Sequence, residues 1–379
     1  MDKSKSRVII IKKLKKKIFE WAFFIGRTLL GIFFCFLGVC LTINLAKSGS
    51  DLFYYAMAFA SPGTAIEVLQ KPFESPQINE PEVFPKEPEP EKTEKDFSEE
   101  ILPPQNFIPE VPENRRGKVT ETQYSASEGG IYVGFENAII KNCTAHSSEK
   151  IRSMLKTKHS LFLSTDSDKS PQVLIYHTHA TEGYEPAERG YFDLSGTWRS
   201  TDPGENMIAV GDVLTSVLTE KGIGVVHDGT MHDDPGYNGS YKRSAATVSG
   251  YLEEFSEISV CLDIHRDAIE PSETEIIKPT AVINGKKAAQ IMIISGCDDG
   301  SMNMPDYWEN LRFAAALGSK IEELYPGLCR PILFDYRKYN MDLSPGLLLI
   351  EIGATGNTLE EAKYSAELLA NALFELLAE

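Results

Sequence analysis

The sequence lacks the short motifs that identify several large enzyme classes. It has no Gly-x-x-x-x-Gly-Lys-Ser/Thr loop, no Gly-x-Gly-x-x-Gly after a predicted strand and no Gly-x-Ser-x-Gly turn. Its six cysteines form no Cys-x-x-Cys pair, so neither a cysteine-rich zinc finger nor a framework of disulfides is expected. These absences argue against a P-loop enzyme, a dinucleotide-dependent enzyme and a serine hydrolase with a nucleophile elbow.

Basic residues are also scarce over most of the chain. After Lys47 there are 28 lysines and arginines against 53 aspartates and glutamates, and the whole chain has a formal net charge of −17. A surface with this excess of negative charge repels phosphate backbones. Nucleic acid is therefore not expected as a partner.

The N-terminal region has the opposite charge and a long apolar run. Residues 1–20 contain eight lysines and arginines, and residues 28–46 form a run of 19 uncharged residues, which is long enough to cross a membrane as a helix. Because the lysines precede the run, the positive-inside rule predicts a cytoplasmic tail at 1–20 and a transmembrane anchor at 21–46. A cleaved signal peptide is the alternative, with a weak cleavage site at "AKSGS". We expect a single-pass protein of the cell membrane, with the rest of the chain extracytoplasmic.

Proline and glutamate dominate the segment that follows. Ten of the 21 prolines lie between Pro72 and Pro112, in stretches such as "EPEVFPKEPEPEKTEKDFSEE". A segment of this composition buries too little apolar surface to offset the entropy lost on ordering. The sequence therefore predicts a disordered extracytoplasmic linker at 47–125 and a folded domain at 126–379.

The hydrophobic pattern of the folded domain alternates between strands and helices. Continuous apolar runs predict buried strands, and apolar residues spaced three or four apart predict helices. Such alternation is typical of a three-layer α/β domain, in which helices cover both faces of a mainly parallel sheet. Asn284-Gly285 predicts a hairpin turn, and Thr358 with Glu361 predicts a capping box. Buried strands are predicted within 171–179, 223–228, 258–267 and 345–357, hairpins within 131–144 and 281–296, and helices within 206–222, 240–255, 306–327 and 358–378.

Three metal-competent side chains follow predicted buried strands. His177, His265 and Glu351 each lie at or just after the carboxyl end of a strand, and these ends meet at one edge of a parallel sheet. A catalytic zinc takes three protein ligands from His and Asp or Glu and leaves one position for water. We therefore predict a Zn²⁺ site with His177 and His265 as ligands and Glu351 as the base that takes a proton from water. Glu182 is the predicted third ligand, and Glu205 is its rival.

Two neighbouring residues have roles that the sequence leaves open. His179 lies two positions after His177 and is predicted as a ligand, as support for the metal site or as a substrate contact. Arg266 follows His265 directly. It is predicted either to act in catalysis, by stabilising an oxyanion or binding a substrate carboxylate, or to form a structural salt bridge.

Six blocks, taken in order, resemble one known family. Together with the basic start, the single anchor and the acidic linker, they closely resemble the stage II sporulation protein P family of endospore-forming Gram-positive bacteria, with similarity of motifs from about residue 130 to the C-terminus. Six ordered blocks are far more specific than any single motif. The blocks are "PQVLIYHTHATEGY", "HDDPGYNGSYKRS", "CLDIHRDA", "WENLRFA", "YPGLCRPI" and "LLLIEIGATGNTLEEA".

This resemblance implies a peptidoglycan hydrolase related to zinc-dependent N-acetylmuramoyl-L-alanine amidases. It implies zinc ligands His177, Glu182 and His265 with Glu351 as the catalytic base, whereas the wider amidases favour Glu205 as the carboxylate ligand. Cleavage of peptide cross-links is implied as a second activity. Such a protein would act at the sporulation septum beside stage II sporulation proteins D and M. The alternative is a wall-binding or scaffold protein without catalysis on an amidase-like fold.

Overall fold

A computed structural model describes residues 110–165 and 170–378 of the chain. The predicted basic tail, the predicted anchor and most of the predicted linker lie outside these residues. Within the described part, no helix combines the length and the apolar character needed to cross a membrane.

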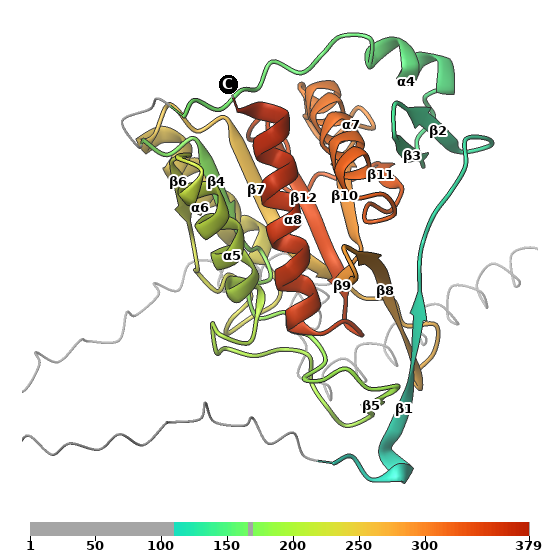
Figure 1. The fold of residues 1–379 in the computed structure, drawn as a ribbon. Coiled ribbons are helices and arrows are strands. Elements are labelled where there is room, and N and C mark those ends of the chain that lie inside the picture. The colour runs from blue at the N-terminus through green and yellow to red at the C-terminus, as the bar shows by residue number, and fades with distance from the viewer. Residues whose placement is uncertain (1–109, 166–169, 379) are drawn as a thin grey trace, which may run out of the picture. The chain divides into compact units, whose positions relative to one another are not determined.

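The larger sheet has eight strands in the order β2-β3-β11-β10-β12-β7-β4-β6 (Figure 1). Neighbouring strands are parallel except for the pairs β2–β3 and β10–β12, which are antiparallel. The prediction of a mainly parallel sheet is therefore confirmed. The strands are β2 (Tyr132–Phe135), β3 (Ala138–Asn142), β4 (Val173–Tyr176), β6 (Val225–His227), β7 (Val260–Asp267), β10 (Ile291–Gly296), β11 (Ile332–Asp335) and β12 (Leu347–Ala354).

Helices cover both faces of this sheet, as the sequence predicts. On one face α8 contacts both α5 and α7, and the three helices lie side by side in Figure 1. On the other face α6 packs through Val248 against apolar side chains of the central strands. The helices are α5 (Met207–Glu220), α6 (Ser240–Glu254), α7 (Tyr307–Leu324) and α8 (Leu359–Leu377), with the short α4 (Ser148–Met154) and the 3-10 turn η1 (Glu113–Arg115) nearer the N-terminus.

The pleat of the central strands assigns alternate side chains to opposite faces. Val173 and Ile175 of β4 belong to the core that contains α5 and α8. Leu174 and Tyr176 belong to the smaller core under α6. All four side chains are fully buried. This alternation decides which polar residues meet beyond the strand ends.

A second sheet holds four strands in the order β5-β1-β8-β9. Its strand β1 (Arg116–Thr122) lies within the predicted linker but pairs in parallel with β8 (Glu275–Ile283). The folded part of the chain therefore includes residues before 126, because backbone pairing with a distant strand supplies order that the local composition does not indicate. The other two strands are β5 (Tyr191–Asp193) and β9 (Lys286–Ala289).

The predicted hairpin at 281–296 is correct at its turn and wrong in its second strand. Asn284 and Gly285 both have positive φ angles and join β8 to β9. The partner strand is Lys286–Ala289, whereas Ile291–Gly296 enters the larger sheet as β10 between β11 and β12. Both segments are apolar enough to be strands, and the sequence does not show where the chain changes sheets.

The end of the chain follows its local signals closely. Thr358 accepts a hydrogen bond from the backbone of Glu361, and Glu361 accepts one from the backbone of Thr358. The predicted capping box at the start of α8 is confirmed. Gly222, the last residue of the predicted helix 206–222, follows α5 with a φ of +88°.

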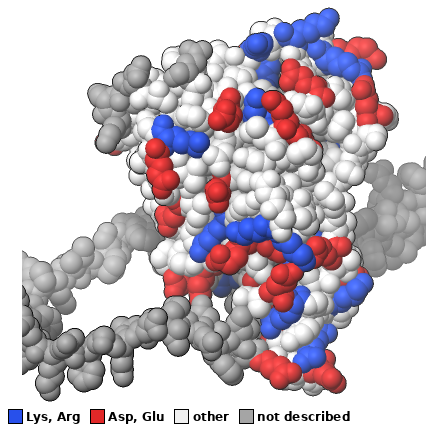
Figure 2. Space-filling model, in the orientation of Figure 1, with Lys and Arg blue, Asp and Glu red and all other residues white. Residues whose placement is uncertain are grey.

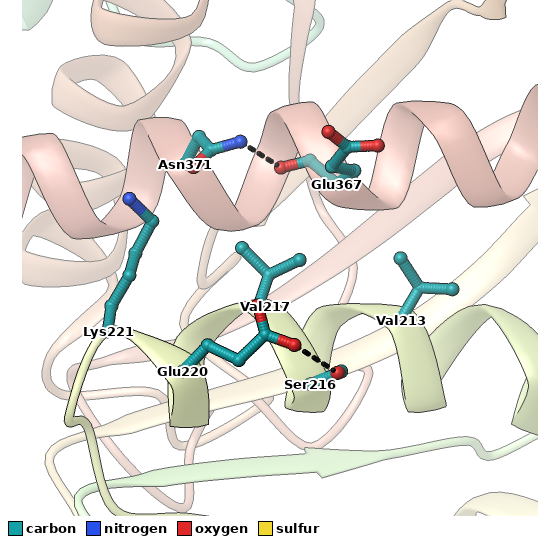
Figure 3. Close-up of a pocket in the computed structure, with 7 residues that line it drawn as sticks. All are labelled: Val213, Ser216, Val217, Glu220, Lys221, Glu367 and Asn371. Atoms are coloured by element: carbon teal, nitrogen blue, oxygen red, sulfur yellow. Dashed lines mark hydrogen bonds between the residues drawn. The ribbon is translucent and has the colours of Figure 1, made fainter.

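The surface of the described domain carries mixed charge. Figure 2 shows lysines and arginines interspersed with acidic side chains on the face seen in Figure 1. A hollow lies between α5 and α8, where Val213, Val217 and Lys221 stand opposite Glu367 and Asn371 (Figure 3). None of the predicted site residues lines it.

Candidate active site

The candidate site lies just after β4 and beside it on β7 and β12, within those two strands. In the parallel pair of β7 and β12, His265 stands directly beside Glu351. In the pair of β4 and β7, Tyr176 stands beside Asp263. Because side chains alternate along a strand, Asp263, His265 and Glu351 lie on the face of the sheet that α6 covers. Two of the three predicted strand-end residues are therefore neighbours on one face.

His265 is enclosed by two carboxylates. Its Nε2 atom lies 2.8 Å from Oδ1 of Asp263, but the angle is not that of a hydrogen bond. Its Nδ1 atom lies 3.5 Å from Oε2 of Glu182. Burial alone would lower the pKa of His265, but the charges of Asp263 and Glu182 raise this pKa well above its usual value. The surroundings of this ring favour positive charge.

Asp263 is the buried anchor of this arrangement. Its two carboxylate oxygens accept hydrogen bonds from the backbone and the hydroxyl of Thr178, at 2.8 and 2.7 Å. Burial would raise the pKa of Asp263, but the charge of His265 and the bonds from Thr178 lower it. The carboxylate is fully buried and ionised, and it holds His265 from behind.

Glu182 brings a second negative charge to the same ring. Its Oε2 atom accepts a 3.3 Å hydrogen bond from the backbone N–H of Arg266, and Arg199 lies 3.7 Å from its Oε1 atom. Burial opposes the charge of Glu182, but the hydrogen bond with His265 and the charge of Arg266 lower its pKa to about 2. Glu182 is therefore an anionic donor in contact with His265.

Glu351 has the opposite electrostatic character. Its side chain is partly exposed, but its Oε2 atom is enclosed and has no hydrogen-bond partner among the described residues. Burial of the carboxyl raises the pKa of Glu351 to about 8; the charges of Asp267 and Glu182 act in the same direction, and that of His265 opposes them. A carboxyl group whose pKa lies near neutral pH is suited to accept and return a proton.

His179 reaches the cluster from the turn after β4. The centres of the His179 and His265 rings are 5.3 Å apart, and the rings are nearly perpendicular. The Nδ1 atom of His179 is buried without a hydrogen-bond partner in the described structure and lies 3.8 Å from Oδ2 of Asp233. Burial, together with the charge of His265, lowers the pKa of His179 to about 4. This ring is neutral at physiological pH and available as a donor.

His177 points to the opposite face of the sheet. It continues the alternation of Val173 and Ile175, and its ring is fully buried. Its Nδ1 atom contacts the carbonyl of Ile264 at 2.9 Å, and its Nε2 atom lies 2.9 Å from Nε2 of His227. Burial and the neighbouring His227 lower its pKa to about 3. The structure therefore favours His179 over the predicted His177 as the first histidine of the site, because the pleat places His177 on the face opposite to His265 and the turn after β4 brings His179 to His265.

Two other predicted residues lie away from the centre of the cluster. The guanidinium of Arg266 donates from Nε to the carbonyl of Gly183 at 3.0 Å and from a terminal nitrogen to that of Trp198 at 3.2 Å. It holds the loop that carries Glu182. Glu205 is exposed and accepts a hydrogen bond from Ser200. Of the two rival carboxylates, Glu182 is the one in contact with His265.

Sequence reasoning missed three contributors to the site, namely Asp263, Asp233 and Tyr241. Asp263 had a usable signal, because a carboxylate inside the apolar run "VCLDIH" costs free energy unless it is paired. Asp233 lies in a polar loop without periodicity. Tyr241, at the start of α6, has its ring parallel to His265 with centres 6.4 Å apart. Burial raises the pKa of Tyr241 further above its usual value, so its hydroxyl remains a proton donor.

The donor set suits a zinc ion in its chemistry. Within residues 110–165 and 170–378, no three His, Cys, Asp or Glu side chains are already arranged to enclose a metal ion. However, His179, Glu182 and His265 are the nitrogen and oxygen donors that a catalytic zinc takes. Nδ1 of His265 faces the carboxylate of Glu182 at 3.5 Å, and two carboxylates favour positive charge at His265. By these criteria the residues fit the ion.

Comparison with known proteins places the chain in a family. The family model of Stage II sporulation protein P matches residues 60–374. The chain belongs to this family. The Stage II sporulation protein P of Bacillus subtilis (strain 168) is 31% identical over 215 residues, which are 54% of this chain and 50% of the relative. The match thus spans half the length of that relative. In this member of the family, the whole cluster from His179 to Glu351 lies within the residues that the family model matches.

Solved structures with some similarity include two N-acetylmuramoyl-L-alanine amidases. The amidase AmiC2 of Nostoc punctiforme is 13% identical, with a TM-score of 0.34 over 55% of this chain and 97% of that chain. The amidase from Clostridium difficile 630 is 16% identical, with a TM-score of 0.33 over the same shares of the two chains.

Proposed function

We propose that this protein is a zinc-dependent peptidoglycan hydrolase that cleaves the amide bond between N-acetylmuramic acid and L-alanine during sporulation. Membership of the Stage II sporulation protein P family supports a role in sporulation. The observation that carries the catalytic proposal is the pairing of Glu351 with His265, next to Glu182. It places an acid with a pKa of about 8 beside a site that favours positive charge.

We assign zinc binding to His179, Glu182 and His265. Bound zinc would supply a Lewis acid that lowers the pKa of a water molecule to about 7. Glu182 is held in its anionic form, and Asp263 holds His265 from the side away from Glu182. The three residues come from the turn after β4 and from β7, so the fold itself sets their spacing.

Glu351 is the proton carrier in this proposal. Its carboxylate takes a proton from water as the water oxygen bonds to the lactyl carbonyl carbon. It then gives the proton to the nitrogen of L-alanine as the carbon–nitrogen bond breaks. A group that both accepts and returns a proton works best when its pKa is near the operating pH, and the pKa of Glu351 is raised to about 8.

Stabilisation of the oxyanion falls to Tyr241 rather than to Arg266. The guanidinium of Arg266 already donates to two loop carbonyls. The Tyr241 ring lies parallel to His265, and its hydroxyl stays protonated. A protonated hydroxyl at this edge of the sheet can donate to the carbonyl oxygen as negative charge develops.

The remaining parts of the proposal concern location and partners. The basic tail and apolar run support a membrane anchor that leaves the folded domain outside the cytoplasm. The acidic, proline-rich segment would serve as a spacer between membrane and wall. Stage II sporulation proteins D and M are the proposed partners at the sporulation septum, and cleavage of peptide cross-links is a proposed second activity.

Digestion of purified sacculi tests the catalytic proposal. The full-length protein with zinc should release stem peptides and leave glycan that lacks them. Glu351→Gln should slow this release by about 10²–10⁴-fold, because general acid–base catalysis contributes that much, and it should retain zinc. Mass spectrometry of the products separates the alternatives: shortened cross-linked dimers indicate an endopeptidase. Peptide release by Glu351→Gln at the wild-type rate would contradict the proposal, as would a wild-type protein that binds no zinc.

A further inference from the structure

The loop between β6 and α6, residues 228–239, contacts His179 in two ways. Its Tyr237 stacks on the imidazole with ring centres 4.3 Å apart and an angle of 6° between the planes. Its Asp233 presents Oδ2 at 3.8 Å from Nδ1 of His179. The loop therefore meets both the face and the edge of one ring, and we call it the clamp loop.

The clamp loop is fixed by a residue of the following helix. Arg243 of α6 donates from Nε to the carbonyl of His232 at 2.7 Å. Its two terminal nitrogens donate to the carbonyls of Asn238 and Gly236. One guanidinium thus satisfies three loop carbonyls, and the side chains of the loop are held in place.

Asp233 is also held in place by its own side-chain contacts. Its side chain is fully buried. One oxygen accepts a hydrogen bond from the Thr181 backbone at 3.3 Å, and the other accepts bonds from the Thr181 hydroxyl and from Arg199, both at 2.7 Å. The Arg199 charge offsets the cost of burying this carboxylate. Asp233 is therefore a fixed acceptor beside Nδ1 of His179.

The same arrangement recurs at the other histidine of the site. His265 has the buried carboxylate of Asp263 at 2.8 Å from its Nε2 atom. A histidine that binds a metal usually donates its second ring N–H to a carboxylate, which fixes its tautomer and orientation. Both histidines of the cluster thus have a fully buried carboxylate behind them.

We infer that Asp233 is a positioning residue that accepts the Nδ1 proton of His179 and directs its Nε2 atom toward the metal. Tyr237 holds the plane of the ring by stacking on it. This inference rests on the proposed zinc site and deepens it, because it assigns the tautomer of His179 and the loop that enforces this tautomer. It concerns His179 rather than His177, because His179 is the histidine whose ring lies beside His265.

Zinc affinity of the full-length protein, purified in detergent, tests this role. Asp233→Asn keeps the shape of the side chain but can present an amide N–H to Nδ1, which favours the wrong tautomer. We expect it to weaken zinc binding by about 10–100-fold in competition with a chelator. Asp234→Asn removes the same charge from the next residue, whose side chain is exposed, and should leave the affinity unchanged.

A spectroscopic measurement reads the tautomer of His179 in the wild type directly. With ¹⁵N-labelled histidine and zinc bound, His179 should show a protonated Nδ1 and a metal-bound Nε2, its signals identified by their loss in His179→Gln. The reverse pattern would overturn the inference, as would equal zinc affinity of Asp233→Asn and wild type. A wild-type protein that takes up no zinc would instead refute the proposed function itself.

Discussion

His265 and Glu351 stand side by side in the parallel pair of β7 and β12, on the face of the sheet that α6 covers. Their two side chains are in opposite electrostatic states. Neighbouring carboxylates favour positive charge at His265 and raise its pKa well above the usual value, whereas burial disfavours negative charge at Glu351 and raises its pKa to about 8. A pair of titratable groups whose environments push their pKa values apart is a common feature of hydrolytic sites.

The two histidines after β4 should respond differently to substitution. His179→Ala removes a proposed ligand and should abolish zinc binding and hydrolysis while the domain stays folded. His177→Gln, on the opposite face, should keep zinc but lower the free energy of unfolding by about 1–3 kcal/mol, because a buried hydrogen-bonded ring is lost. Metal analysis and urea unfolding of both variants check this. Loss of zinc in His177→Gln, with retention in His179→Ala, would contradict the assignment.

Two glycines in helices offer a matched pair of stability tests. A Cβ atom at Gly211 in α5 would lie 2.4 Å from Nε2 of His227 and 2.7 Å from Nε2 of His177. Gly211→Ala should therefore destabilise the protein by about 1–3 kcal/mol through overpacking. A Cβ atom at Gly250 in α6 meets nothing within 4 Å, so Gly250→Ala should stabilise by about 0.5–1 kcal/mol. Thermal unfolding measures both changes, and equal effects at the two positions would disagree with the packing described.

The buried His177 should make stability depend on pH. The pKa of His177 is about 3 in the folded protein and 6.5 in the unfolded chain. The unfolded chain therefore binds more protons than the folded protein below pH 6.5. Stability from this group is present above pH 6.5 and is lost as the pH falls toward 3, by up to about 1.4 kcal/mol per pH unit. Measuring the free energy of unfolding of wild type and of His177→Gln, with a chelator present to remove metal, isolates this contribution. Their difference in free energy should shrink from pH 7 to pH 4, and a constant difference would show that His177 carries no such shift.

Arg266 should prove to be structural rather than catalytic. Its guanidinium donates to the carbonyls of Gly183 and Trp198, and each bond from a charged donor contributes about 1.5–3 kcal/mol. Arg266→Met should lower the free energy of unfolding by a few times more than Arg337→Met, whose partly exposed ion pair with Asp335 contributes less than about 1 kcal/mol. Urea unfolding of the two variants tests this. Wild-type stability with a large loss of hydrolysis in Arg266→Met would restore a catalytic role.

Local sequence signals predicted much of the larger sheet and its helices. Apolar runs located β4, β7 and β12, and the capping box located the start of α8. Local signals failed where backbone pairing over long distances decided the structure. β1 is ordered by β8, more than 150 residues away, and β10 joins a different sheet from β9 although both follow one turn.

By itself the sequence determined that polar, metal-competent residues interrupt or follow the apolar runs, because such a residue costs free energy there unless it is paired or used. It placed His265, Glu351 and Glu182 correctly near one another. Only the tertiary structure decided between His177 and His179. The pleat sends His177 into the core beside His227, and the turn after β4 brings His179 back to His265 and Asp233. That choice depends on where the strand stops alternating, and the neighbouring loops and helices fix this point.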